Sequence, residues 1–217
     1  NGDAKQALEL YRQKGDIILT KNRQSAIKRL VADWKEIGLR TPENITVLAQ
    51  TNHEVRQLNR LCQAARLESG AIKPKHIALD EFNIHVGERI RFRETSHLRG
   101  IKNGDKAVVL SIDLRGNVTV QLDKKFSSKE EKRGLKTLVK FAPAELRELK
   151  TQLGYAATVS SFQGSENMHV QVLLGGNQSD RNMSYVQLTR STKQCRLYVD
   201  RATAGPELET IAKIMNK

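Results

Sequence analysis

The first seventy positions of the chain alternate between two kinds of hydrophobic pattern. Apolar residues recur every three or four positions in three stretches, which predicts amphipathic helices over residues 3–15, 22–38 and 52–70. Between these stretches lie two short and almost continuous apolar runs, at residues 16–20 and 43–50. Such runs are typical of strands that are covered on both faces. The order of strands and helices therefore predicts a parallel α/β domain.

The pattern changes near Phe82, where short segments of alternating apolar and polar residues begin. Four such segments, with turn sequences KNGD and RGN between them, predict a small antiparallel β unit, with a barrel as its expected form. The segments cover residues 89–94, 106–113, 117–123 and 137–142. The charged sequence DKKFSSKEEKRGLK, between the last two, is expected to be a solvated and mobile hairpin tip.

The α/β pattern returns after residue 142. Helices are predicted over residues 143–154 and 182–193, and strands over residues 155–161, 168–176 and 195–200. We therefore expect an α/β fold, a parallel sheet with helices on both faces, interrupted by a small inserted β-barrel. The expected parts are residues 1–81 and 143–217 for the α/β domain and residues 82–142 for the insertion.

Composition narrows the class of protein. The chain has 217 residues, of which 38% are hydrophobic and 28% are charged, as in soluble globular proteins. No stretch approaches the roughly 18 apolar residues of a membrane span, so no membrane partner and a cytoplasmic location are expected. Two cysteines and five histidines show no metal-site spacing, so no metal is expected. Because the first residue is Asn1 and not methionine, we expect a piece of a longer protein.

The charge indicates a polyanionic partner. The formal net charge is +13, and residues 82–150 hold sixteen Lys or Arg against nine Asp or Glu. Arg89, Arg91 and Arg93 alternate, so they share one face of a predicted strand, and with Lys102 and Lys106 they are expected to follow a phosphate backbone. Aromatic residues are sparse there, which favours backbone contacts without sequence readout. A surface strand with solubilising charge is the alternative.

Three blocks of sequence occur in a fixed order along the chain. They are TNHEVRQLN at residues 51–59, YAATVSSFQGSE at residues 155–166 and YVQLTR at residues 185–190, with GERIRF and GIKNGD between the first two. In this order they resemble motifs IV, V and VI of RecD-like superfamily-one DNA helicases, and most closely the helicase portion of conjugative relaxase–helicases. The resemblance covers nearly the whole chain. It implies a RecA-like domain that carries an inserted SH3-like barrel.

The resemblance also implies roles for individual residues. Arg190 would be an arginine finger that reaches the γ-phosphate of ATP and stabilises charge in the transition state. The residues implied to line the nucleotide cleft are Gln163, Gly164, Glu166 and Thr189. The residues implied to contact single-stranded DNA are Thr51, Asn52 and Thr158. The chain departs from the family at Ser160, Ser161 and Phe162 in motif V, and at Thr192, where the family has a second arginine.

One part of a helicase is missing from the sequence. There is no GxxxxGK[ST] loop, and the Asp80-Glu81 pair follows motif IV, the wrong place for a magnesium-binding motif. ATP and Mg²⁺ would therefore bind in the full-length protein, between this domain and an upstream RecA-like domain of the same chain, and this chain alone is expected to be inactive. The family implies 5′-to-3′ movement. The alternatives are a non-catalytic single-stranded nucleic-acid-binding module with a degenerate nucleotide cleft, and an RNA-binding protein.

Overall fold

The computed structural model describes residues 4–132, 134–162, 167–175 and 191–210. The chain divides into two compact units. Unit 1 consists of Asn1–Cys62 and Ala156–Lys217, and unit 2 is the intervening segment Gln63–Tyr155. Each unit has its own sheet and its own hydrophobic core.

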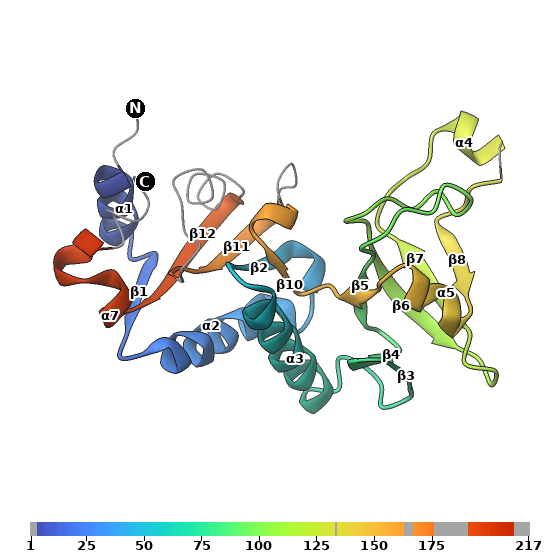
Figure 1. Cartoon of the computed structure of the whole chain (residues 1–217), viewed down its shortest axis with the longest axis horizontal. Coiled ribbons are helices and arrows are strands. Elements are labelled where there is room, and N and C mark those ends of the chain that lie inside the picture. Colours follow the sequence, from blue (N-terminus) through green and yellow to red (C-terminus); the bar gives the residue numbers. More distant parts are fainter. Residues whose placement is uncertain (1–3, 133, 163–166, 176–190, 211–217) are drawn as a thin grey trace. The chain divides into compact units, whose positions relative to one another are not determined.

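Unit 1 is built on a five-stranded sheet in which every pair of neighbours is parallel (Figure 1). The strand order is β1-β12-β11-β2-β10. The strands are β1 (Ile17–Thr20), β2 (Ile45–Ala49), β10 (Ala156–Thr158), β11 (Asn167–Leu173) and β12 (Ser191–Asp200). Because all five run in one direction, their carboxyl ends meet at one edge of the sheet. The predicted parallel α/β class is confirmed.

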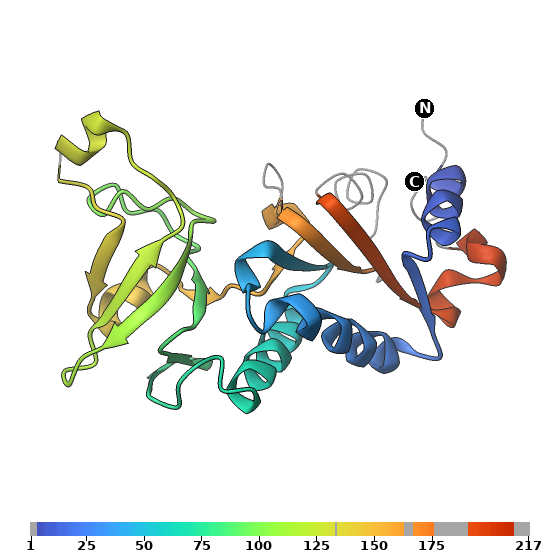
Figure 2. The ribbon, with the colours of Figure 1, turned by 180° about the vertical axis from the view of Figure 1, so that it is seen from behind.

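Helices cover both faces of this sheet. They are α1 (Ala4–Gln13), α2 (Arg23–Gly38), α3 (Asn52–Glu68) and α7 (Arg201–Ala204), with single 3₁₀ turns η1 (Pro42–Asn44), η2 (Ser160–Phe162) and η3 (Pro206–Leu208). On one face, Leu197 and Val199 pack in a core with Leu8 of α1 and Ala204 of α7. Tyr198, which points to the other face, donates a hydrogen bond to Asp33 of α2. Figure 2 shows α2 and α3 along the same side of the strands.

Helix α2 begins and ends where the sequence predicts. The side chain of Asn22 caps its first turn by accepting a hydrogen bond from the Ser25 amide at 2.9 Å. Its apolar stripe buries Leu30 and Trp34 completely. A Cβ at Gly38 would lie 2.1 Å from the Trp34 ring, so only glycine fits beside the indole in the last turn.

Unit 2 is an antiparallel β unit, as predicted. A two-stranded ribbon, β3-β4, accompanies a five-stranded sheet of order β8-β7-β6-β5-β9. The strands are β3 (His76–Leu79), β4 (Phe82–His85), β5 (Arg89–Arg91), β6 (Lys106–Ile112), β7 (Val118–Leu122), β8 (Leu138–Phe141) and β9 (Gln152–Leu153), and the helices are α4 (Ser128–Lys132) and α5 (Pro143–Glu148). Among the described strands, β8 and β9 do not pair with each other, so the sheet is open and the predicted barrel is not established.

The boundaries of unit 2 differ from the predicted insertion at residues 82–142. The sequence predicts a helix over residues 143–154, but helix α5 ends at Glu148. The strand β9 follows it and pairs with β5. Leu146 and Leu149 join the core of unit 2. At the other boundary, the last turns of α3 and the β3-β4 ribbon belong to unit 2. The helix predicted over residues 182–193 also needs correction at its end, because β12 begins at Ser191.

A buried polar network lies inside unit 2. The carboxylate of Glu88, which is fully buried, accepts hydrogen bonds from the Tyr155 hydroxyl and from the Gln63 amide, the latter at 2.6 Å. Arg66 donates to the Tyr155 hydroxyl and to the Gly87 carbonyl, both at 3.1 Å. Burial raises the pKa of Glu88, although Tyr155, Gln63 and Arg66 oppose that change. The network joins α3, Glu88 just before β5 and Tyr155, which lies between β9 and β10.

Candidate functional site

Two of the predicted DNA-contacting segments lie side by side at the carboxyl edge of the unit 1 sheet. Thr51 and Asn52 follow β2, and Thr158 ends β10. The two strands are neighbours, and Thr158 is in register with Ala49. Ligands of parallel α/β sheets bind outside the carboxyl ends of the strands. The sheet therefore brings motifs IV and V together at the edge where a ligand is expected.

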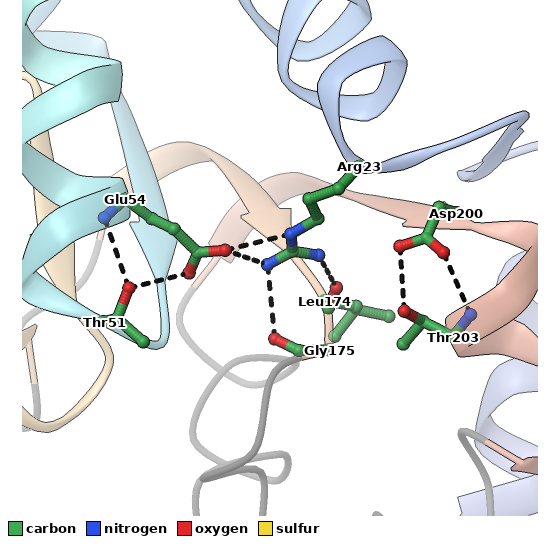
Figure 3. Close-up of polar contacts among 7 residues, drawn as sticks. All are labelled: Arg23, Thr51, Glu54, Leu174, Gly175, Asp200 and Thr203. Carbon is green, nitrogen blue, oxygen red and sulfur yellow. Dashed lines mark hydrogen bonds and ion pairs between the residues drawn. The ribbon is translucent and has the colours of Figure 1, made fainter.

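The hydroxyl of Thr51 is engaged within the protein (Figure 3). It accepts a hydrogen bond from the Glu54 amide and donates one to the Glu54 carboxylate, each at 3.2 Å. The bond from the Glu54 amide caps the first turn of α3. A phosphate ligand needs a donor, and the one hydroxyl proton of Thr51 already has an acceptor. Thr51 thus holds the helix end, and the neighbouring Asn52 is exposed and carries an amide that can donate to a ligand.

Arg23 ties three elements together beside Thr51 (Figure 3). Its Nε donates to Glu54 Oε1 at 2.9 Å, and Nη2 donates to the Gly175 carbonyl at 3.2 Å. Nη1 donates to the Leu174 carbonyl. The guanidinium thereby links the start of α2, the first turn of α3 and the end of β11. Sequence reasoning missed this residue, because its partners lie 31 and more positions away.

Asp200 adds a second carboxylate at this edge. It caps α7 by accepting hydrogen bonds from the Thr203 amide at 3.0 Å and the Thr203 hydroxyl at 2.8 Å (Figure 3). Burial alone would raise the pKa of Asp200, but these hydrogen bonds and the charge of Arg23 outweigh it and lower the pKa. Asp200 therefore stays ionised near Arg23.

Thr158 also serves the local backbone. Its hydroxyl accepts a hydrogen bond from the Ser161 amide at 3.3 Å, and its carbonyl accepts one from the Ser161 hydroxyl at 2.9 Å. These bonds shape the turn η2 that leaves β10. Asn59, the last motif IV residue, holds β10 from the side: its amide group exchanges two hydrogen bonds with the Ala156 backbone, at 2.8 and 3.3 Å.

The predicted nucleotide-cleft residues lie outside the described part of the chain. These are Gln163, Gly164, Glu166 and Thr189, and the predicted arginine finger, Arg190, lies outside it as well. The described strands that follow them are informative. Asn167, which follows Glu166, starts β11, and Ser191, which follows Arg190, starts β12. Asn167 and Ser191 are register partners, so motifs V and VI are each followed by one of two adjacent strand starts.

A small pocket lies between α2 and this amino-terminal part of the sheet. Its volume is about 30 Å³, and its polar lining includes Asp33, Glu36, His169 and Arg196. Burial, Lys193 and Arg196 lower the pKa of His169. That volume suits a water molecule and is too small for a nucleotide.

The basic residues of unit 2 do not form the exposed face that their alternation suggested. Arg89 and Arg91 are only 3% and 6% exposed, because β5 is an inner strand flanked by β6 and β9. Arg89 is paired in bidentate fashion with Asp123, with Nη1 2.8 Å from Oδ1. Arg93 and Lys106 are half-buried, and Lys102 is exposed.

Burial and the charges of neighbouring cations lower the pKa of two of these residues. Burial, followed by the charges of Arg89 and Arg91, lowers the pKa of Lys106 to about 8, while Asp123 opposes the shift. Burial and Arg93 lower the pKa of Arg91 to about 10. A phosphate placed beside this cluster would favour the charged forms.

Two general properties of the described residues complete the picture. None of the described helices is long and apolar enough to cross a bilayer. Within the same residues, no three His, Cys, Asp or Glu side chains gather in a way that could hold a metal ion. The thiols of Cys62 and Cys195 are buried, and burial raises the pKa of each.

Comparison with solved structures identifies the fold. The fold matches that of a Pif1 helicase from Bacteroides, solved with ADP-AlF3 and single-stranded DNA, over 87% of this chain and 47% of that one, with a TM-score of 0.50 and 18% identity. The chain thus has a RecA-like helicase fold. In sequence it is similar to conjugal transfer protein TraA, at 28% identity over 200 residues for the protein of Agrobacterium fabrum and 29% over 202 residues for that of Rhizobium radiobacter.

These relatives are much longer than the chain. Each alignment covers 91% of this chain and 17% of the relative. No family model matches the chain. A TraA-like sequence on a helicase fold confirms the resemblance to the helicase portion of conjugative relaxase–helicases.

Proposed function

We propose that this chain is the second RecA-like domain of an ATP-dependent DNA helicase that belongs to a conjugative DNA-transfer protein of the cytoplasm. The observation that carries the proposal is a TraA-like sequence, over 91% of the chain, on the fold of a helicase. In this proposal Arg190 supplies the arginine finger, and Gln163, Gly164, Glu166 and Thr189 line the same cleft. ATP and Mg²⁺ bind in the full-length protein against another RecA-like domain of the same chain, and movement is 5′-to-3′.

We assign the contacts with DNA and those with nucleotide to opposite edges of the unit 1 sheet. Asn52 and the capped turns at Thr51 and Thr158 belong to the carboxyl edge, where we place single-stranded DNA. The register pair Asn167 and Ser191 begins the strands at the opposite edge, next in sequence to Glu166 and Arg190. Strands β11 and β12 would thus connect nucleotide contacts at one end to DNA contacts at the other. Val172 of β11 and Leu197 of β12 are fully buried in the core of unit 1.

Unit 2 would add phosphate contacts through Arg93, Lys102 and Lys106. Arg89 and Arg91 are buried, so in this proposal they support the cluster and raise its positive potential. Asp123 holds the Arg89 fork in place. Such contacts position a backbone and carry no sequence information.

Binding of single-stranded DNA by this chain is the first test. We expect fluorescence anisotropy to show binding that weakens with salt, the logarithm of the association constant falling by about 0.7 for each phosphate contacted per tenfold rise in salt. A DNA oligonucleotide and its RNA counterpart are compared at two salt concentrations. A strong preference for RNA would favour the RNA-binding alternative, and absence of binding to either would count against the proposal.

Affinity for single-stranded DNA is expected to fall as pH rises from 7 to 9. Lys106 has a pKa of about 8 in the free protein and must be charged to bind phosphate, so binding takes up a proton above that pH. A required charge at this pKa gives a loss of about tenfold over these two pH units. Lys106→Arg, which stays charged, is the matched variant and should bind almost equally at both pH values. An equal pH dependence in the two proteins would remove Lys106 from the interface.

A further inference from the structure

The connection between β7 and β8 is folded onto a second loop of unit 2. Lys124 donates hydrogen bonds to the Gly100 carbonyl and to the Asp105 carboxylate, and its ammonium lies 5.1 Å from the centroid of the Phe126 ring. A Cβ at Gly100 would lie 2.9 Å from Leu135 and 3.0 Å from Phe126, so glycine lets the loops approach closely. We call residues 95–105, 123–132 and 134–137 the double loop. The base of the predicted hairpin tip is thus held at Lys124, and the expected mobility of the tip itself stays a prediction.

The ion pairs of the double loop engage Asp105 and Asp123 but few of its lysines. The carboxylates of Asp105 and Asp123 pair with Lys124 and Arg89, and Arg99 pairs with Glu145 of α5. Glu131 is exposed. Within the described part of the double loop, five lysines are exposed and enter none of these pairs: Lys102, Lys125, Lys129, Lys132 and Lys136. The acids mainly hold the loops together, while the exposed surface keeps an excess of positive charge.

The residue types on this surface indicate which class of partner it would bind. Phe126 is half-buried against the core of unit 2, so its ring is used in packing and is not offered to a nucleobase. Proteins that grip single strands rely on stacking with aromatic rings. Lysine ammonium groups act as point charges that suit phosphates in any sequence, and duplex DNA presents a charge about every 1.7 Å of its axis. Leu98 is 86% exposed but stands alone as a large apolar group in the double loop, which disfavours membrane insertion.

We propose that the double loop binds the phosphate backbone of duplex DNA, at a site separate from the single-strand contacts of unit 1. This inference rests on the proposed helicase function and names a second partner for it. A motor that separates strands meets a duplex, and a duplex-binding surface on unit 2 would keep that duplex bound while unit 1 acts on the single strand.

The test compares two triple variants with the same change of charge. Lys125, Lys129 and Lys132 are replaced by Gln in the double loop, and Lys14, Lys28 and Lys35, exposed lysines of unit 1, are replaced by Gln in the control. Anisotropy is measured with a blunt duplex and with a single strand across a salt series. Thermal melting checks that both variants remain folded.

For the double-loop variant we expect duplex affinity to fall on the order of tenfold, and the salt slope for duplex to shrink by about 2.7, the value for three phosphate contacts. Single-strand affinity should change by less than about threefold, since the variant leaves the proposed single-strand contacts of unit 1 and of Arg93, Lys102 and Lys106 unaltered. The control variant and Leu98→Ala should leave duplex binding unchanged. Unchanged duplex affinity, or an equal loss in the control, overturns the inference. Loss of binding to phosphatidylserine vesicles with duplex affinity intact also overturns it. If single-strand binding is absent from the unaltered chain, the proposed function fails first.

Discussion

Arg190→Ala in the full-length protein is expected to lower the rate of DNA-stimulated ATP hydrolysis by about 10³- to 10⁵-fold. The expectation follows from the role proposed for the guanidinium, which would stabilise the charge that develops during phosphoryl transfer. Arg190→Lys should recover only a small part of the rate, because an ammonium lacks the planar fork of donors. Steady-state hydrolysis with saturating single-stranded DNA measures the effect.

The control for Arg190 must separate chemistry from binding and folding. Affinity for single-stranded DNA should stay within a few-fold of the unaltered protein, since we place DNA contacts at the other edge of the sheet. Arg40→Ala removes an exposed arginine of the same unit and should leave hydrolysis unchanged. If Arg190→Ala hydrolyses ATP at the normal rate, the arginine finger is assigned to the wrong residue. The non-catalytic binding module then becomes the better interpretation.

Glu88→Ala is expected to destabilise unit 2 by about 3–5 kcal/mol, the usual cost of removing one partner from a buried charged network. The change would leave the Gln63 amide and the Tyr155 hydroxyl without their acceptor, and Arg66 without a nearby negative charge. Glu148→Ala, at an exposed position of α5, is the matched control and should cost less than about 0.5 kcal/mol.

The measurement must report on unit 2 alone. The single tryptophan, Trp34, lies in unit 1, so its fluorescence follows the wrong unit. Hydrogen exchange of the amides in β6 and β7 gives the free energy of opening of the unit 2 sheet. A loss below about 1 kcal/mol for Glu88→Ala would mean that water or rearranged side chains satisfy the network.

Local sequence patterns were sufficient for the framework of unit 1. Helix α2 was expected over residues 22–38 and runs from Arg23 to Gly38, and the buried strand β2 lies within the apolar run at residues 43–50. Both signals are strong because they depend on neighbouring residues only. The strand β9 has two residues and exists through its pairing with β5, so no periodicity in the sequence could reveal it.

Motif resemblance selected residues of the candidate site without indicating their contacts. Thr51 and Thr158 lie at the carboxyl edge of the sheet, yet both hydroxyls accept hydrogen bonds from local backbone. Alternation put Arg89 and Arg91 on one face of a strand without showing that neighbouring strands would bury that face. Glu88 and Arg23 were missed for a related reason: a charged residue in isolation suggests solvent, and only distant partners explain its burial.

The strand pairing of unit 1 does not involve the segment between its two parts. All five strands of its sheet lie outside Gln63–Tyr155. The chain leaves unit 1 after Cys62 and re-enters it at Ala156. Close to these points, two hydrogen bonds between the Asn59 side chain and the Ala156 backbone join the two parts of unit 1. A change of length or sequence within the intervening segment would therefore leave the strand pairing of the unit 1 sheet intact.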